Sequence, residues 1–153
     1  MNHKQRFMGS MMLLVATMAI ASFTYAAYPK KMAITVELWN DSGADLYLAA
    51  ASWVPPDTEL SAYVIAHDSP TTSFSLVLNN PRNDLAIFRM REGARECEFT
   101  LGHKTTFSWF GLDPSPEKFA RARSSGTVPA QCSASVIKGS KSMAAYTVRV
   151  RMS

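Results

Sequence analysis

The sequence predicts an all-β protein: an antiparallel β-sandwich, or a closed barrel, of about eight or nine short strands, with one short helix in a long loop and one disulfide. Three observations predict this fold. Apolar and polar residues alternate with a period of two over most of the chain. Turn-forming Gly, Pro, Asn and Asp recur between these runs. The only two cysteines, Cys97 and Cys132, follow a leader typical of exported proteins.

The first element is a secretory signal peptide over residues 1–26. Lys4 and Arg6 precede an uncharged run from Met11 to Phe23, which is shorter than the about 20 residues that a membrane-spanning helix needs. Small residues follow this run, and we expect cleavage after Ala26. Residues 27–153 have a length suited to one domain with one core. We therefore expect a single-domain protein that is periplasmic or secreted.

Alternation and turns predict the strands in order along this domain. In the first strand Ile34, Val36 and Leu38 fall on one face, and in the last strand Tyr146, Val148 and Val150 do so. One wet and one dry face favour antiparallel pairing. The predicted strands are 32–39, 45–52, 59–66, 72–79, 84–91, 95–102, 105–110, 131–137 and 143–152. The turns between them include the sequences NDSGAD (40–45), VPPDT (54–58), HDSP (67–70), NNPRND (79–84), EGAR (92–95) and KGSK (138–141).

Cys97 and Cys132 are predicted to form a disulfide that ties strand 95–102 to strand 131–137. Export takes them to a compartment where disulfides persist. A catalytic pair of Cys97 and His103 would need a free thiolate beside its base, which a bonded partner removes. A zinc site would need closely paired ligands, and these cysteines and the histidines His67 and His103 lack such spacing. We expect no metal and no cofactor.

The segment 113–129 interrupts the strand pattern. Ser115 is a candidate N-cap, Pro116 suits a first helical position, and Arg121 and Arg123 precede Gly126. These signals predict a short helix in a long loop within the disulfide-closed segment. Such a loop often carries binding residues. The alternative is a lid over one end of the core, with Phe119 packed inward.

Charged residues on the strands suggest a solvated hairpin and a basic patch. Arg89 and Arg91 are predicted to lie across the turn at 92–95 from Glu96 and Glu98. Arg149 and Arg151 lack an evident acidic partner in sequence. Together with Lys118, Arg121 and Arg123 they are predicted to form one basic patch, or else they keep an edge strand soluble.

Three tryptophans and two histidines offer further candidate sites. Trp39 and Trp53 adjoin turns, and Trp109 is followed by Phe110; such aromatics either stack on ligands and membranes or plug the ends of the core. His67 lies in a turn beside Asp68, and His103 is expected to be exposed at a hairpin tip. Neither belongs to a recognisable catalytic motif such as G-x-S-x-G. Asn40 begins a glycosylation sequon, which matters only in a eukaryotic secretory pathway.

These observations favour an exported, non-enzymatic binding protein that recognises another protein, as an inhibitor, immunity-type protein or accessory subunit. The predicted partner-binding residues are Trp109, Phe110, Lys118, Phe119, Arg121 and Arg123. The net charge of +4 falls to +2 once Lys4 and Arg6 leave with the signal, which is too weak to indicate nucleic acid. Two alternatives stay open: a membrane-binding or lytic β-sandwich that uses the tryptophans and the arginines, and a small secreted hydrolase that uses His67 or His103.

Overall fold

The protein consists of two β-sheets and has no helix in the residues that the structure describes. The computed structural model describes residues 30–60, 62–68, 71–80, 83–106, 115–139 and 144–153. The predicted signal peptide, Trp109 and Phe110 lie outside these residues. Within the described ranges no helix is long and apolar enough to cross a membrane.

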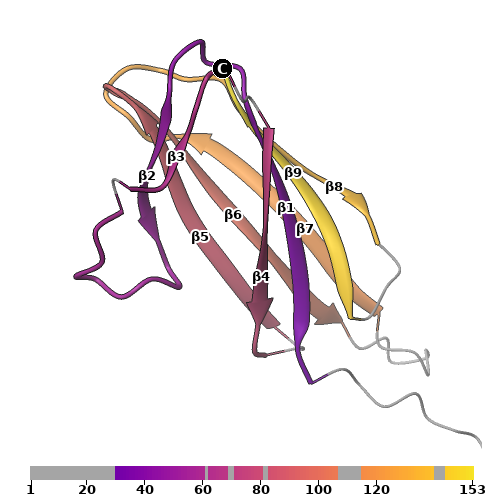
Figure 1. Cartoon of the computed structure of the whole chain (residues 1–153). Coiled ribbons are helices and arrows are strands. Elements are labelled where there is room, and N and C mark those ends of the chain that lie inside the picture. The colour runs from indigo at the N-terminus through magenta and orange to yellow at the C-terminus, as the bar shows by residue number, and fades with distance from the viewer. Residues whose placement is uncertain (1–29, 61, 69–70, 81–82, 107–114, 140–143) are drawn as a thin grey trace, which may run out of the picture.

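Nine strands make up the two sheets (Figure 1). One sheet has four strands in the order β4-β1-β9-β8, and the other has five in the order β3-β2-β5-β6-β7. We refer to them as the four-stranded and the five-stranded sheet. The strands are β1 (Met32–Asn40), β2 (Leu46–Ala51), β3 (Val64–Ile65), β4 (Thr71–Leu78), β5 (Asn83–Glu92), β6 (Arg95–Thr106), β7 (Ser115–Ser124), β8 (Cys132–Lys138) and β9 (Ala145–Met152).

Most neighbouring strands are antiparallel, as the alternation predicts, but the central pair of the four-stranded sheet is not. β1 pairs with β9 in parallel register, with Val36 opposite Val148. Parallel strands are normally buried on both faces, so clean alternation gave no sign of this pair. The alternation nevertheless places the core correctly, because it depends on the pleat rather than on strand direction.

The core lies between the two sheets and contains the residues that alternation places on the dry faces. Ile34, Val36 and Val150 of the four-stranded sheet and Phe99 and Leu101 of the five-stranded sheet are fully buried in one apolar cluster. The disulfide joins Cys97 on β6 to Cys132 on β8, as predicted, and it links the two sheets. A hydroxyl adds a second link, because Tyr146 on β9 donates to the Gly102 carbonyl on β6 over 2.8 Å.

The predicted helix in 113–129 is wrong: residues 115–124 form β7, an edge strand paired with β6 from Thr106↔Ser115 to Cys97↔Ser124. Ala120 and Ala122 pack against the core, whereas Phe119, Arg121 and Arg123 alternate with them and face outward. Capping signals and helix propensity are weak preferences, and the gain from pairing along the whole of β6 outweighs them. Pro116 fits near the start of an edge strand.

Two other predicted strands differ in extent. The structure has one long β6 through residue 106, where strands 95–102 and 105–110 are predicted, and 107–110 lie outside the described residues. The predicted strand 59–66 is reduced to the two residues of β3, preceded by a looping segment. The turn at 92–95 joins β5 to β6 as expected, and Arg89 pairs with Glu96 at 3.1 Å.

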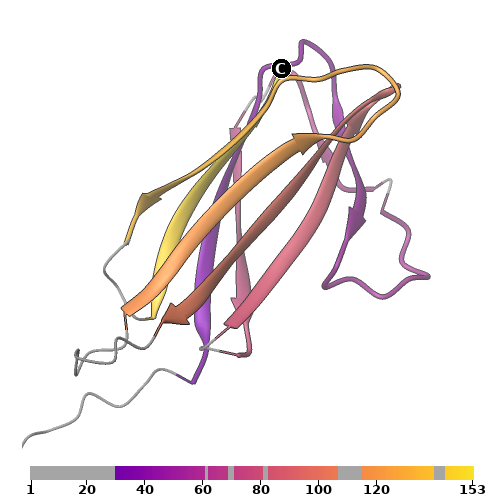
Figure 2. The same cartoon turned by 180° about the vertical axis from the view of Figure 1, so that it is seen from behind.

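The two sheets are joined along one side and open along the other. β7 and β8, an edge strand of each sheet, lie against each other and are connected by residues 125–131 (Figure 2). The disulfide links β8 to β6 on the same side. On the other side β4 is the edge of the four-stranded sheet, and the short β3 is the edge of the five-stranded sheet. Figure 1 shows β4 standing apart from β2 and β3.

Candidate binding cleft

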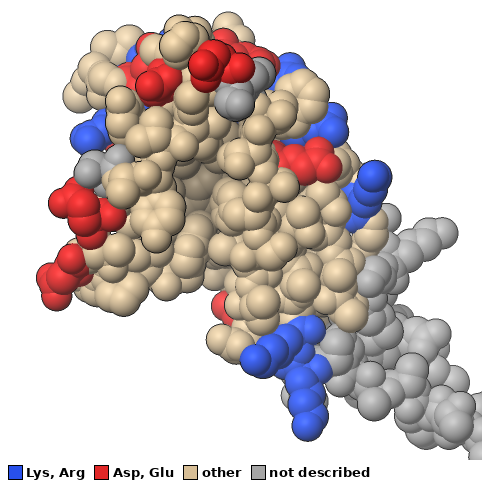
Figure 3. Space-filling model, viewed as in Figure 1, with Lys and Arg blue, Asp and Glu red and all other residues tan. Residues whose placement is uncertain are grey.

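An apolar cleft of about 410 Å³ occupies the open side between the sheets. Figure 3 shows it as a hollow surrounded by uncharged side chains. Its lining comes from β1, β2, β3, β4, β5 and the segment between β2 and β3. The lining residues are Leu38, Leu48, Trp53, Val54, Tyr63, Val64, Ile65, Thr72, Phe74, Phe88 and Met90. Its volume lies within the range of about 300 to 1,000 Å³ that is typical of ligand pockets.

The floor of the cleft is the edge of the core. Leu38, Phe88 and Met90 are almost fully buried, and they reach the cleft because no strand covers them on this side. The Trp53 ring lies edge-on to Phe88, with centroids 5.6 Å apart, and 6.3 Å from Phe74 on β4. This aromatic cluster joins the two sheets at the base of the cleft.

The outer wall of the cleft is formed by residues 52–60 and 62–63, which contain a series of turns. Val54 donates to the Ala51 carbonyl, Thr58 to Pro55, and Tyr63 to Leu60. Pro55 and Pro56 suit these turns, since their fixed φ favours turn positions. The Leu48 amide then donates to the Tyr63 carbonyl over 3.0 Å, which fixes the segment beside β2.

Large apolar side chains remain exposed on this rim. Tyr63 is 58% exposed, Val64 is 43% and Trp53 is 40%. Scattered exposed apolar residues are ordinary, but three that line one cleft form a contiguous patch of the kind found at binding sites. The cleft therefore offers a surface on which an apolar group can be buried.

The edge of β4 beside the cleft has free backbone groups. The Ala33 amide donates to Ala144, next to β9, so the odd-numbered residues of β1 turn their backbone groups toward β9 and the even-numbered ones toward β4. The register pairs Val36 with Phe74. The even-numbered residues of β4 therefore bond to β1, and the amides and carbonyls of Ser73, Ser75 and Val77 face away from the sheet. These groups bond to no other backbone in the part of the chain that the structure describes.

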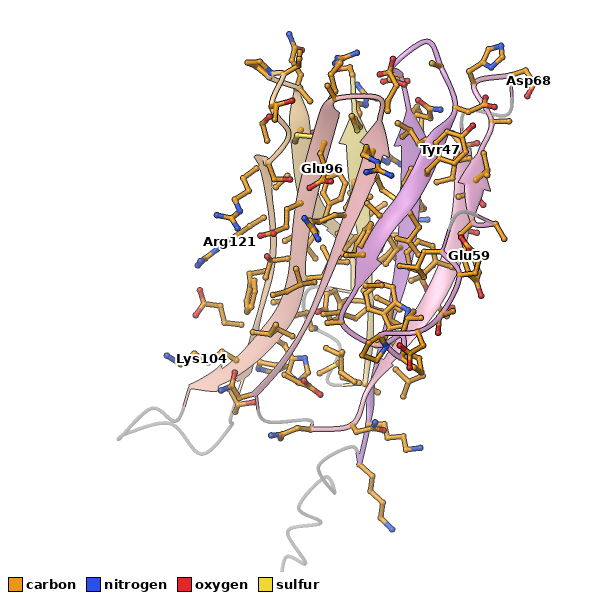
Figure 4. All side chains as sticks on the ribbon, turned by 90° about the vertical axis from the view of Figure 1, so that its left-hand side faces the viewer. Tyr47, Glu59, Asp68, Glu96, Lys104 and Arg121 are labelled. Carbon is orange, nitrogen blue, oxygen red and sulfur yellow. A yellow bond between two sulfur atoms is a disulfide. The ribbon has the colours of Figure 1, made fainter. Side chains whose placement is uncertain are left out.

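Acidic and basic residues are unevenly distributed along the chain, and most residues that line the cleft come from the acidic segment 32–81. The sequence from 32 to 81 contains six acidic residues and no Lys or Arg. The acidic residues are Glu37, Asp41, Asp45, Asp57, Glu59 and Asp68. Asp57 and Glu59 are exposed in the segment that walls the cleft, and Asp68 lies between β3 and β4. Figure 4 shows Glu59 and Asp68 pointing outward on the side of the molecule where β4 lies.

Not all of these carboxylates are available to a ligand. Glu37 pairs with Arg149 at 2.9 Å and Asp41 with Arg151 at 3.0 Å. Asp45 accepts from the His67 amide at 3.0 Å and contacts its Nδ1 at 2.9 Å. This hydrogen bonding lowers the pKa of Asp45 and raises the pKa of His67. Asp57 and Asp68 make no ion pair with any described residue.

Asn40 shapes the turn above the cleft. It is 3% exposed, and its Nδ2 donates to the carbonyls of Ala44 and Ile65 over 2.8 and 3.0 Å. The side chain thereby ties the β1–β2 turn to β3. Since both amide protons are used inside the fold, the folded chain leaves no room for a glycan at this sequon.

The predicted partner-binding residues that the structure describes do not share one surface. Phe119, Arg121 and Arg123 lie on the outer face of β7, where Phe119 covers Gly102 and Arg121 lies 5.4 Å from the Phe119 ring. Phe119 is therefore not packed inward as the lid alternative requires. Arg123 pairs with Glu98 at 2.7 Å. Lys118 lies on the inner side, where its Nζ donates to the Gly139 carbonyl over 2.6 Å.

The predicted basic patch is also wrong. Arg149 and Arg151 have the acidic partners described above, which come from β1 and the turn after it, far away in sequence. Both guanidinium groups also lie over the Trp39 ring, at 4.7 and 5.2 Å from its centroid. They occupy the outer face of the four-stranded sheet, whereas Arg121 and Arg123 occupy that of the five-stranded sheet.

His103 is not at an exposed hairpin tip but inside the core. It is fully buried near the C-terminal end of the long β6, and its Nε2 lies 2.9 Å from the Asn80 carbonyl. Its Nδ1 has no hydrogen-bond partner among the described residues. Neither His103 nor His67 is hydrogen-bonded there to a Ser, Thr or Cys side chain. No group of three or more potential metal ligands occurs in the described ranges.

The fold and the site define an all-β protein of two sheets with an apolar cleft between their open edges. The chain matches no family model, no curated protein and no solved structure. The assignment of function therefore depends on the cleft.

The sequence carried two signals for this cleft that its analysis missed. One is the run of 50 positions from 32 to 81 without a basic residue, which marks an acidic half of the chain. The other is β4, a strand whose sequence TTSFSLVL has no charge and no proline, although edge strands usually carry such protection. Neither signal identifies the cleft alone, because only the fold shows that β4 is an edge.

Proposed function

We propose that this protein is an exported, non-enzymatic binding protein, an open β-sandwich that recognises another protein through the cleft on its open side. The observation that carries the proposal is the exposed apolar rim of Trp53, Tyr63 and Val64 over a floor of core residues. Interfaces obtain most of their binding energy from a few aromatic anchors in desolvated pockets, and this rim offers two of them. A disulfide and the shared core hold the scaffold rigid, which favours recognition without rearrangement.

The membrane-binding alternative has less support. It requires the tryptophans and the arginines to act on one surface. Trp53 lines the cleft, whereas Trp39 lies between two arginines on the outer face of the four-stranded sheet. Those arginines are already paired with carboxylates, which weakens their attraction for anionic lipid.

Affinity capture with cleft variants tests the proposal. The disulfide-bonded chain is used as bait in native extract, beside a Tyr63→Ser/Val64→Ser variant and a Leu85→Ser control. Leu85 is 48% exposed on the outer face of the five-stranded sheet, so the control removes a comparable apolar side chain elsewhere.

We expect a stoichiometric partner that the wild type and the control retain and that binds the cleft variant at least about tenfold more weakly. A partner that binds all three baits equally contradicts the proposal. Capture of no protein, together with sedimentation on anionic vesicles, would replace it by the membrane-binding function.

A further inference from the structure

We infer that the occupant of the cleft is an extended segment of the partner protein, with apolar and basic side chains in alternation, which adds as a strand to the free edge of β4. This inference rests on the proposed function and states the chemistry of the partner. It combines three features of the open side: the unbonded backbone of β4, the apolar cleft beside it, and the exposed carboxylates of Asp57 and Asp68 near the cleft.

The backbone of β4 offers a complete docking edge. The amides and carbonyls of Ser73, Ser75 and Val77 face outward, and a strand added there would satisfy them. The side chains of these residues are exposed on the outer face, and none of them is charged or bulky enough to block the approach of a strand. β4 has eight residues, a usual strand length, so a partner segment of similar length would be fully paired.

The lining of the cleft indicates which side chains the added strand carries on its inner face. Thr72 and Phe74 point from β4 into the cleft, so a neighbouring strand in the same sheet would point alternate side chains into it as well. There they would contact Leu38, Phe88 and Trp53, which are apolar. Every second residue of the partner segment is therefore expected to be apolar.

The exposed carboxylates near the cleft indicate which residues the added strand carries on its outward face. Asp57 and Asp68 are exposed and make no ion pair among the described residues; Asp57 lies in the segment that walls the cleft, and Asp68 follows β3, which lines it. The 32–81 segment contains no Lys or Arg, and its one histidine, His67, is already hydrogen-bonded to Asp45. Basic residues on the outward face of the added strand would lie in this negative field.

The same argument disfavours a second copy of this chain as the occupant. Two copies joined edge to edge through β4 would bring two acidic 32–81 segments to one interface. Like charges at an interface cost binding energy, and the basic half of each copy would lie away from the contact. A basic partner meets no such repulsion.

Synthetic peptides test the inference directly. The probe is an end-capped peptide of about ten residues that alternates valine and lysine, and the comparison peptide alternates valine and glutamate. A third peptide repeats the first with N-methyl groups on alternate amides, which removes the donors needed for strand pairing. Binding to the disulfide-bonded chain is measured by calorimetry at low and at physiological ionic strength.

We expect the valine-lysine peptide to bind at least about tenfold tighter than the other two, and to weaken as salt is added. Equal binding of the valine-glutamate peptide would contradict the role proposed for Asp57 and Asp68. Equal binding of the N-methylated peptide would contradict strand addition.

A variant of β4 gives the matching test on the protein. Ser75→Pro removes one outward amide and places a ring on the edge, while the bonds of β4 to β1 come from its even-numbered residues. Its control is Ser75→Thr, which keeps the amide. We expect Ser75→Pro to lose at least about tenfold in peptide affinity and the control to lose little. Circular dichroism checks that both variants remain folded.

The two proposals can fail separately. If the captured partner is sensitive to Tyr63→Ser/Val64→Ser but Ser75→Pro retains it, the cleft binds a protein and strand addition is wrong. If the chain alone dimerises in sedimentation and Ser75→Pro abolishes the dimer, the occupant is a second copy. If a partner binds independently of both sites, the proposed function of the cleft is wrong as well.

Discussion

At the scale of single residues, the contact between Tyr146 and Gly102 shows how one hydroxyl holds the two sheets in register. Tyr146 is 3% exposed, and burial raises the pKa of its phenol well above the usual range, so the hydroxyl stays protonated and can donate. The acceptor is the carbonyl of Gly102, a residue that lacks a side chain because the Phe119 ring and the Asp84 carbonyl occupy that space.

Tyr146→Phe is therefore expected to lower the free energy of unfolding by about 0.5 to 1.5 kcal/mol, because one buried hydrogen bond is lost while Gly102 keeps its pairing with Phe119 on β7. Urea denaturation measures the change. Tyr47→Phe is the control, since Tyr47 is 40% exposed and its hydroxyl reaches water. Equal effects of the two substitutions would show that the buried hydrogen bond adds nothing.

At the scale of elements, the strands that follow a period of two were predictable and the departures have identifiable causes. β1, β5 and β9 were found because each buries one face, so the pattern of burial appears in the sequence. β7 was missed because Ala120 and Ala122 bury so little that helix-capping signals outweighed their alternation. The buried position of His103 was missed because β6 continues past Gly102, where a turn was predicted.

The disulfide is the clearest prediction at this scale, because it closes a loop with a sequence separation of 35 that includes all of β7. In the loop-entropy estimate, replacing Cys97 and Cys132 together by serine costs about 4 kcal/mol. We expect this loss in the free energy of unfolding by urea, measured against the oxidised wild type. Addition of a reductant should then leave the double variant unchanged and bring the wild type toward it. A wild type that is equally stable with and without reductant would contradict a stabilising role.

At the scale of the whole molecule, the acidic residues lie in the same part of the chain as the open side with its cleft. The first four strands form an acidic part with the cleft and the free edge, and the rest of the chain supplies the basic residues and the closed side. The fold alone brings these features together, since β1 is in the centre of one sheet and β2 and β3 are at the edge of the other. The disulfide-linked β scaffold was predictable from the sequence, whereas the sequence pattern predicts the contact surface on the basic side, at Lys118, Phe119, Arg121 and Arg123.

Binding kinetics distinguish a contact surface at the cleft and β4 from one on the outer face of β7. Rim charges act mainly on the association rate. Replacing Asp57 and Asp68 by asparagine is therefore expected to slow association of the valine-lysine peptide about threefold to tenfold at low ionic strength, with little change in the dissociation rate. The control is Arg121→Gln, which removes an exposed charge from the outer face of β7 and should leave both rates unchanged. Stopped-flow fluorescence of a labelled peptide measures the rates.

The same variants are then tested with the captured partner. If Arg121→Gln weakens that partner and the aspartate variant does not, the partner binds to β7 and the cleft serves another purpose.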